Sequence, residues 1–170
     1  MCEVNEMPSD NSRLRLREAE PGDCHRLWVL ANDPVVRSFS FSQKQIEWES
    51  HVEWFTRVIE SLDSHIFLAE DAEGDFVGQI RFDLERGDAV VTVEIVPSRR
   101  GSGLGVALIR AGTLRYLEEI PAVNVVHAFI KKTNRASIAA FSKAGYKHSR
   151  DLVSSGHNSC DMVFQRDSER

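Results

Sequence analysis

The sequence predicts an α+β sandwich built on a central mixed sheet, and three observations lead to that fold class. Strand-like alternation and helix-like periodicity both occur, but they do not repeat as a βα series. Three strand-like segments follow one another in the middle of the chain, which is typical of a meander. The third segment then leads through a glycine-rich turn into a helical pattern, and such a mixture of connections implies a mixed sheet.

The first part of the chain is expected to hold one strand and two helices. Residues 1–12 are polar and patternless, so we expect a flexible tail followed by a single domain over residues 13–166. Pro21 is a typical first residue of a helix, and Ser42 is a typical helix cap. The expected elements are, in order, a strand at 13–17, a helix at 21–31, a loop at 35–40 and a helix at 42–62.

The second part of the chain is expected to hold most of the sheet. Turn residues separate the strand-like runs, and Gly145 follows the last helical pattern in the manner of a helix C-cap. The expected elements are strands at 65–70, 75–84 and 90–96, a helix ending near 119, a strand at 123–130, a helix at 133–144, and a closing hairpin of strands at 146–153 and 160–165.

The composition is that of an ordinary globular protein. A chain of 170 residues with 42% hydrophobic residues is long enough for one domain with a sizeable core. The net charge of −5 argues against nucleic acid as a partner, which needs a basic excess. Cys2, Cys24 and Cys160 fit neither a disulfide framework nor a zinc pattern, so no metal is expected. Without a membrane-length apolar run or a signal peptide, we expect a cytoplasmic protein with no membrane partner.

The segment from Val90 to Leu108 indicates a site for an anionic ligand. A β-branched strand ends at Pro97, and three alternate glycines, Gly101, Gly103 and Gly105, precede a helix. The first N–H groups of a helix have no partner within it, and its dipole favours negative charge there. Glycines let such a backbone approach a phosphate closely. The alternative is a tight turn that binds no ligand.

The loop does not fit two common nucleotide-binding motifs. It lacks the Lys-Ser/Thr ending of a P-loop, and no acidic residue ends a strand about twenty residues further on, as a dinucleotide fold requires. It resembles instead the acyl-CoA loop of the GNAT acetyltransferase family, Arg/Gln-x-x-Gly-x-Gly/Ala. The matching residues are Arg100-Gly101-Ser102-Gly103-Leu104-Gly105.

A second motif supports this resemblance. The run from His127 to Tyr146 looks like the family's strand, Asn-headed helix and Gly-aromatic ending, and it follows the loop in the family order. The resemblance covers roughly residues 13–165. It implies a GNAT-like α/β/α sandwich with a mostly antiparallel sheet, and an enzyme that uses acetyl-CoA to acetylate a small-molecule amine.

The resemblance also implies which residues bind acetyl-CoA. Ile95 and Val96 would present backbone groups to the pantetheine arm, and Arg100 with the amides of residues 101–105 would hold the pyrophosphate. Further contacts are expected from the Asn-headed helix of the second motif. Its candidate residues are Asn134 and Phe141 for pantetheine and Ser137 or Lys143 for the adenosine end.

Acetyl transfer to an amine needs a base, and Glu94 is the candidate. It is an acid in an otherwise β-branched strand, two residues before Val96. A carboxylate near the acceptor can remove the amine proton, and a backbone N–H of the same strand can polarise the thioester carbonyl. The alternative is that Glu94 only pairs with Arg81 of the neighbouring strand. Asp83 is a weaker candidate because it lies nearer a turn.

The family often places a tyrosine seven residues after the Asn of the second motif, to protonate the leaving thiolate. Here that residue is Phe141, which cannot donate a proton. Either Tyr146 or Ser137 takes over this role, or the thiolate leaves unprotonated, as its modest pKa permits. The alternative for Tyr146 is a packed residue of the sheet.

The first helices carry a finer resemblance, to GNAT enzymes that acetylate a nucleotide-linked amino sugar in nonulosonic-acid biosynthesis, as in the pseudaminic-acid route. It rests on the segments 28–40, 46–55 and 78–82 and on the later run His127-Ala128-x-Ile130. It makes Arg37 a candidate for binding the diphosphate, His51 and Trp54 candidates for the edge of the acceptor cleft, and Arg81 a further substrate contact. Alternatively, Trp54 belongs to the core and His51 to the surface.

Three functional hypotheses remain open at this stage. The favoured one is an N-acetyltransferase acting on a UDP-4-amino-sugar. The second is an enzyme that acetylates the N-terminal amine of a ribosomal or other protein. The third is an acyl-CoA-binding sensor without catalysis. By family habit, the closing hairpin would form a homodimer interface.

Overall fold

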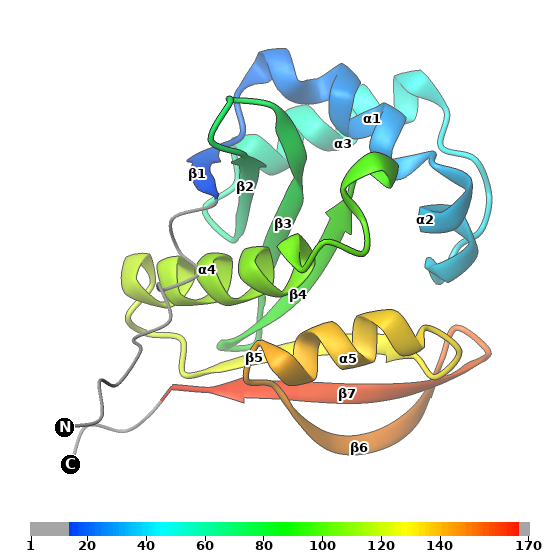
Figure 1. Cartoon of the computed structure of the whole chain (residues 1–170), viewed down its shortest axis with the longest axis vertical. Helices are drawn as coiled ribbons and strands as arrows, with labels where there is room; N and C mark the ends of the chain where they lie inside the picture. Colours follow the sequence, from blue (N-terminus) through cyan, green and yellow to red (C-terminus); the bar gives the residue numbers. More distant parts are fainter. Residues whose placement is uncertain (1–13, 167–170) are drawn as a thin grey trace, which may run out of the picture.

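The computed structural model describes residues 14–166 and shows one seven-stranded sheet (Figure 1). The strand order is β1-β2-β3-β4-β5-β7-β6. Within these residues the β4–β5 pair is parallel and the other neighbouring pairs are antiparallel. The strands are β1 (Arg15–Glu18), β2 (Ser64–Glu70), β3 (Phe76–Glu85), β4 (Asp88–Ile95), β5 (Val125–Lys131), β6 (Lys147–Ser154) and β7 (His157–Gln165). The predicted fold class is therefore confirmed, whereas the tail predicted at 1–12 lies outside the described residues.

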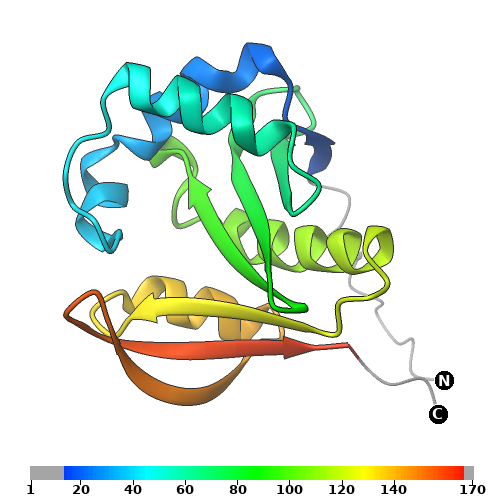
Figure 2. The same cartoon turned by 180° about the vertical axis from the view of Figure 1, so that it is seen from behind.

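Helices cover both faces of the sheet (Figures 1 and 2). The helices are α1 (Cys24–Ala31), α2 (Pro34–Phe39), α3 (Trp48–Ile59), α4 (Leu104–Glu119) and α5 (Arg135–Lys143), with 3₁₀ turns at Pro21–Asp23 and Pro97–Arg99. Alternation along β2 divides the core: Phe67 packs in the cluster that includes α4 and α5 residues, whereas Leu68 packs in the cluster of α1 and α3. No helix within residues 14–166 is long and apolar enough to cross a membrane.

Two predictions for the segment between α1 and α3 were wrong. The predicted loop at 35–40 contains α2, which begins at Pro34 and is capped by the Asp33 carboxylate, 3.1 Å from the N–H groups of Val35 and Val36. The helix predicted from Ser42 begins only at Trp48. The side chain of Asn32 forms two hydrogen bonds with the main chain of Ile46, of 2.8 and 2.9 Å. These contacts are tertiary, so local propensity did not reveal them.

The sheet opens between β4 and β5. The two strands pair only at Ala89↔Val126 and Val90↔His127 and then diverge (Figure 1). β4 stays on β3 up to Val96, whose N–H donates to Val77, and β5 stays on β7 through Lys131. The sheet is therefore V-shaped, with a gap between the carboxyl-terminal halves of its two central parallel strands.

Gly78 allows β3 and β4 to approach closely beside this gap. A Cβ at residue 78 would lie 2.2 Å from the Glu94 carbonyl oxygen and 3.1 Å from the Ile95 Cα. Because both atoms belong to the backbone of β4, they cannot move aside without bending the strand. We expect Gly78→Ala to lower the free energy of unfolding by about 2 kcal/mol, as overpacking does in a dense core.

Urea unfolding of this variant tests the expectation. The matched control is Gly156→Ala in the turn of the closing hairpin, where nothing lies within 4 Å of the added Cβ and only the left-handed φ of 77° opposes the change. A midpoint for Gly78→Ala equal to that of the wild type would show that β4 adapts freely.

Candidate active site

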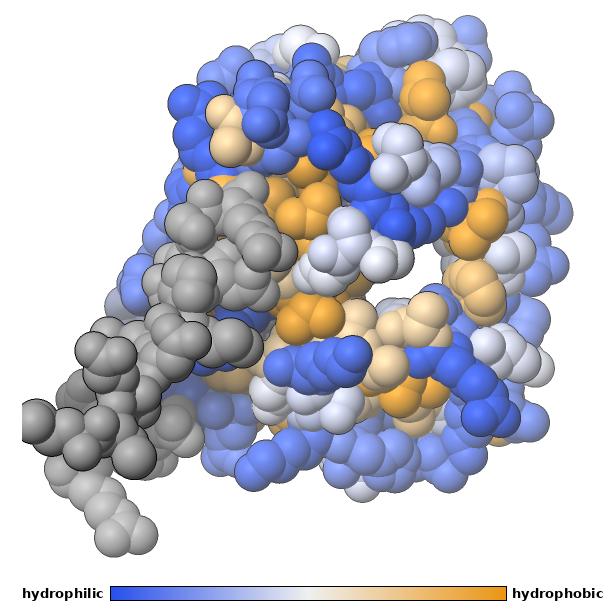
Figure 3. Space-filling model, viewed as in Figure 1, coloured by the Kyte–Doolittle hydropathy of each residue, from blue (hydrophilic) through white to orange (hydrophobic). Residues whose placement is uncertain are grey.

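A cavity of about 350 Å³ occupies the gap between β4 and β5. Residues on both sides of the sheet contribute to its wall, from α2, β4, the glycine loop, β5 and α5. Figure 3 shows an opening on this side of the molecule, between the region of α2 and that of α5 in the orientation of Figure 1. The two faces of the sheet therefore communicate at the gap.

The edge of β4 offers main-chain groups to the cavity. Because the Val96 N–H bonds to β3, the alternation of an antiparallel ladder turns the backbone groups of Val93 and Ile95 away from β3 and toward the gap. No residue of β5 pairs with them. The Ile95 carbonyl accepts a 3.0 Å hydrogen bond from Arg100, which leaves its N–H and both groups of Val93 for a ligand. Ile95 therefore fits its predicted role, whereas the Val96 N–H is already used inside the sheet.

The glycine loop has the predicted strand-loop-helix geometry. Gly101 and Gly103 have φ angles of 76° and 83°, a region that favours glycine, and Gly103 is the N-cap of α4. A Cβ at either position would meet nothing within 4 Å, so open space lies beside the loop. Gly101 and Gly105 line the cavity, whereas Ser102, Gly103 and Leu104 do not. The first N–H groups of α4 thus form an anion-binding end close to the gap.

Arg100 forms two contacts within the protein that the sequence did not predict. Its guanidinium donates to the Ile95 carbonyl and, at 2.7 Å, to the Asp33 carboxylate that caps α2. Arg100 therefore connects the glycine loop to the helix across the gap. It lines the cavity, but two of its donors are already bound within the protein.

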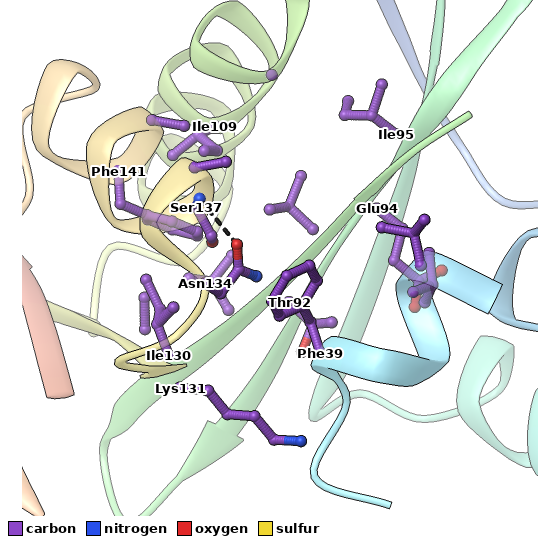
Figure 4. Close-up of a pocket in the computed structure, with 18 of the residues that line it drawn as sticks. Phe39, Thr92, Glu94, Ile95, Ile109, Ile130, Lys131, Asn134, Ser137 and Phe141 are labelled. Atoms are coloured by element: carbon purple, nitrogen blue, oxygen red, sulfur yellow. Dashed lines mark hydrogen bonds between the residues drawn. The ribbon is translucent and has the colours of Figure 1, made fainter. Parts of the chain in front are cut away.

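The α5 side of the cavity brings together three predicted cofactor contacts (Figure 4). Asn134 caps α5 by accepting a 3.1 Å hydrogen bond from the Ser137 N–H, and both residues line the cavity with Phe141. Capping uses only the Asn134 oxygen, so its amide nitrogen is available for a ligand. Lys143 is exposed at the end of α5 and does not line the cavity.

Glu94 lies in the cavity wall on the α2 side of the sheet. Gln79 of β3 donates a 2.9 Å hydrogen bond to its carboxylate. Burial raises the pKa of Glu94 above its ordinary value, although the Gln79 hydrogen bond and the charges of Arg81, Arg37 and Arg100 oppose that rise. The proposed pairing with Arg81 does not form, because Arg81 donates to Asp83 at 2.8 Å and lies over the Trp54 ring. Gln79 is a site residue that the sequence analysis missed.

The raised pKa of Glu94 predicts a pH-dependent effect of Glu94→Gln on stability. Below the ordinary pKa of 4.5, the carboxyl is protonated in both the folded and the unfolded chain. As the pH rises above that value, the unfolded chain ionises first, so stability is lost in the wild type but not in the neutral variant. We therefore expect Tm of Glu94→Gln minus Tm of the wild type to grow between pH 4 and pH 8. A difference that is constant or shrinks with pH would show that Glu94 is not held in a desolvated site.

Tyr146 lies away from the cavity. Its ring is buried against Phe141, and its hydroxyl is 2.7 Å from the Thr113 hydroxyl beneath α4. Burial raises its pKa further above the ordinary value. This position does not support the predicted role as an acid, and it fits the packed residue named as the alternative. Ser137 is the hydroxyl among the two candidates that lines the cavity.

The residues predicted for the acceptor are used mainly for packing. Arg37 donates to the main-chain carbonyls of residues 31, 42 and 44 and so fixes the loop after α2. His51 is 2% exposed, and its Nε2 donates to the Cys24 carbonyl at 3.0 Å. Trp54 packs on the small core and carries Arg81 on its ring. None of the four, Arg81 included, lines the cavity. For His51 and Trp54 the reason is that the aromatic stripe of α3 faces α1 and β2.

Other residues form the α2 side of the cavity. α2 supplies Val35, Val36 and Phe39, of which Phe39 is 38% exposed. β4 supplies Thr92 beside Glu94, and the end of β5 supplies Phe129 and Lys131. The sequence could have indicated the α2 residues as part of the site only if α2 had been predicted as a helix.

Comparisons with known proteins agree with this geometry. Residues 13–147 match the family model described as acetyltransferase (GNAT) domain. Spermidine N-acetyltransferase from Vibrio cholerae, solved with CoA and spermine, superposes with a TM-score of 0.81 at 20% identity, over 91% of this chain and 96% of that one. Aminoglycoside acetyltransferase AAC(6')-Ib, solved with coenzyme A, gives 0.76 at 18%, over 90% and 95%. No curated protein matches the chain.

The chain belongs to the GNAT acetyltransferase family, because the match covers most of its length. The predictions of that family and of an enzyme of the N-acetyltransferase class are confirmed. At identities near 20%, the solved structures establish a common fold and leave the acceptor open.

Proposed function

We propose that the protein transfers an acetyl group from acetyl-CoA to the primary amine of a small molecule, at the gap between β4 and β5. The observation that carries the proposal is a single cavity lined by both the glycine loop and Glu94. A donor bound at the loop and an acceptor bound beside Glu94 would meet there.

The residues around the gap fit acetyl-CoA. The N–H groups of the loop and of the α4 N-terminus suit the pyrophosphate, and the main-chain groups of Val93 and Ile95 suit the amides of a pantetheine arm. Asn134 and Ser137 offer side-chain contacts from α5. When bound, the cofactor supplies an activated acetyl group and leaves as the CoA thiolate.

Glu94 would act as the general base. An amine attacks only when its nitrogen lone pair is free, so a proton must leave it, directly or through one water molecule. The raised pKa of Glu94 makes its carboxylate a better proton acceptor than an exposed one. Gln79 would fix the orientation of that carboxylate. The free N–H groups of β4 are placed to stabilise negative charge on the thioester carbonyl oxygen.

For the leaving group, Phe141 offers only apolar contact. A thiolate is stable enough to leave without a proton at neutral pH. If a proton is donated, Ser137 would be the donor, since it is the hydroxyl residue of the cavity wall nearest to Phe141 in the sequence. The catalytic role predicted for Tyr146 is not part of this proposal.

The residues that support an amino sugar as the acceptor differ from those predicted from the sequence. Arg37, His51 and Trp54 do not line the cavity and so no longer support binding of a nucleotide-linked amino sugar. The aromatic rings of Phe39 and Phe129 do line it and would provide an apolar wall for the sugar. A polyamine or aminoglycoside carries several positive charges. Among the described residues that line the cavity, however, Glu94 is the one carboxylate. We therefore retain the amino sugar as the favoured acceptor and the N-terminal amine of a protein as the alternative. The homodimer and the cytoplasmic location remain predictions.

The test is release of CoA from acetyl-CoA in the presence of different amines. The panel contains a UDP-4-amino-4,6-dideoxy sugar, a ribosomal-protein N-terminal peptide, and spermidine. Release that depends on an amine, with the acetylated amine found by mass spectrometry, supports the proposal. If acetyl-CoA raises Tm but none of these amines promotes release, other amines are tested next, and the acyl-CoA sensor becomes the favoured hypothesis once they fail as well.

A further inference from the structure

Lys131 is a buried cation in the wall of the cavity. It ends β5, is 5% exposed, and lines the cavity (Figure 4). Phe129 of the same strand lines the cavity as well. Burying an ammonium group is costly unless hydrogen bonds or an opposite charge compensate for the lost water. The contacts of Lys131 therefore indicate what the site is built to hold.

Those contacts leave the ammonium largely unsatisfied. Its nitrogen lies 3.4 Å from the Ser38 carbonyl in α2, and it forms no ion pair with any carboxylate among residues 14–166. Asp161 on the neighbouring strand is occupied by His127, at 3.0 Å, and by Arg150, at 3.5 Å. An ammonium group has three donors, so at least two remain for a ligand.

The next residue shows the usual behaviour of a surface lysine. Lys132 is exposed and pairs with Asp151 at 2.5 Å. Two adjacent lysines thus have opposite environments, and only Lys131 lines the cavity.

Strand alternation places Lys131 on the same side of the sheet as Glu94. Ala128 and Ile130 of β5 and Val93 and Ile95 of β4 pack with the α4 and α5 cluster. Side chains alternate along a strand, so Lys131 and Glu94 belong to the opposite side, which α2 covers. The contact of Lys131 with Ser38 of α2 agrees with this placement.

We infer that Lys131 binds an anionic group, a phosphate or a carboxylate, carried by the amine acceptor. The inference rests on the proposed function and narrows its acceptor class. The amine would lie at Glu94, the anion at Lys131, and the part that joins them against Phe39 and Phe129. An acceptor with only positive charges would leave Lys131 without a partner.

Two pairs of acceptors, each with one anionic and one non-anionic member, test this inference. The first pair is a UDP-4-amino-4,6-dideoxy sugar and the methyl glycoside of the same sugar. The second pair is L-phenylalanine and 2-phenylethylamine. They are compared in the wild type, in Lys131→Met, and in Lys132→Met as the matched control. The first pair reports on a phosphate and the second on a carboxylate.

We expect the anionic member of one pair to have a kcat/KM at least tenfold above that of its neutral partner. Lys131→Met should raise its KM about 10- to 100-fold, the effect of losing a charged hydrogen bond, and change the neutral partner and acetyl-CoA less than twofold. Lys132→Met should keep the preference. Because an apolar side chain replaces an unpaired buried charge, Lys131→Met should not lower Tm.

Two results would overturn the inference. One is acetylation of the neutral amines with no preference for an anionic partner in either pair. The other is a preference that survives Lys131→Met. Both leave the proposed function standing, whereas failure to acetylate any amine refutes the proposed function itself.

Discussion

Glu94→Gln should lower kcat by about 10²- to 10⁴-fold, the contribution of a positioned general base. Glutamine has the same shape and can still accept the Gln79 hydrogen bond, so the geometry of β4 should persist. The dissociation constant for acetyl-CoA should stay within about twofold, because Glu94 lies on the side of the sheet opposite α4 and α5. Steady-state kinetics measure kcat, and calorimetric titration with acetyl-CoA, without an amine, measures the dissociation constant separately.

Asp83→Asn is the matched control for this prediction. Asp83 is a nearby carboxylate of β3, but it already accepts from Arg81 and Ser64, each at 2.8 Å, and it does not line the cavity. We expect it to change kcat by less than about threefold, as a substitution away from the reacting groups. If Glu94→Gln retained wild-type turnover, or if both variants lost it equally, Glu94 would not be the base.

Gly105→Asp should weaken CoA binding at least 100-fold. Gly105 lies in the first turn of α4 and lines the cavity, and a Cβ there would meet only the Ile95 side chain, at 3.8 Å. A carboxylate close to a bound pyrophosphate repels it by several kcal/mol where the dielectric is low. The same carboxylate is favourable for the helix itself, because an acidic residue in the first turn complements the helix dipole.

Gly105→Asn separates charge from size, because Asn and Asp have nearly the same shape. We expect its CoA affinity to fall much less than that of Gly105→Asp, with both variants folded and the Tm of Gly105→Asp no lower than that of Gly105→Asn. Equal losses of affinity would mean that the loop lacks room for any side chain. Unchanged affinity in both would place the pyrophosphate elsewhere.

Much of the fold was predictable because its signals are local. The alternation in β2, β3 and β4, the positive-φ glycines of the loop and the Asn134 cap each lie within a short stretch of sequence. Their order then identified the family. The start of α2 was missed although its signal is also local, since Asp33 at the N-cap and Pro34 at the first helical position are typical of a helix start. The late start of α3 was not predictable in this way, because the Ile46 N–H donates to the side chain of Asn32, 14 residues away.

The site was predictable on one side of the sheet only. The cofactor side follows the loop and the α5 cap, which are compact motifs. The proposed acceptor side combines α2, the middle of β4 and the end of β5, which lie far apart in the chain. His51 and Trp54 were predicted at the edge of a cleft, but they pack among α1, α3 and β2. An aromatic stripe along a helix is equally typical of a cleft wall and of a core, so the sequence pattern could not distinguish the two. Lys131 was visible only as half of a basic pair, and its burial required the structure.

A crystal structure with CoA bound tests the central claim most directly, which is that the gap between β4 and β5 joins the cofactor side to Glu94. We expect the pyrophosphate at the N–H groups of residues 101–105 and the pantetheine arm along Val93 and Ile95. The sulfur should lie within the gap and face the Glu94 side of the sheet. A pantetheine arm that stays outside the gap on the α4 and α5 face, with its sulfur away from Glu94, would contradict the account.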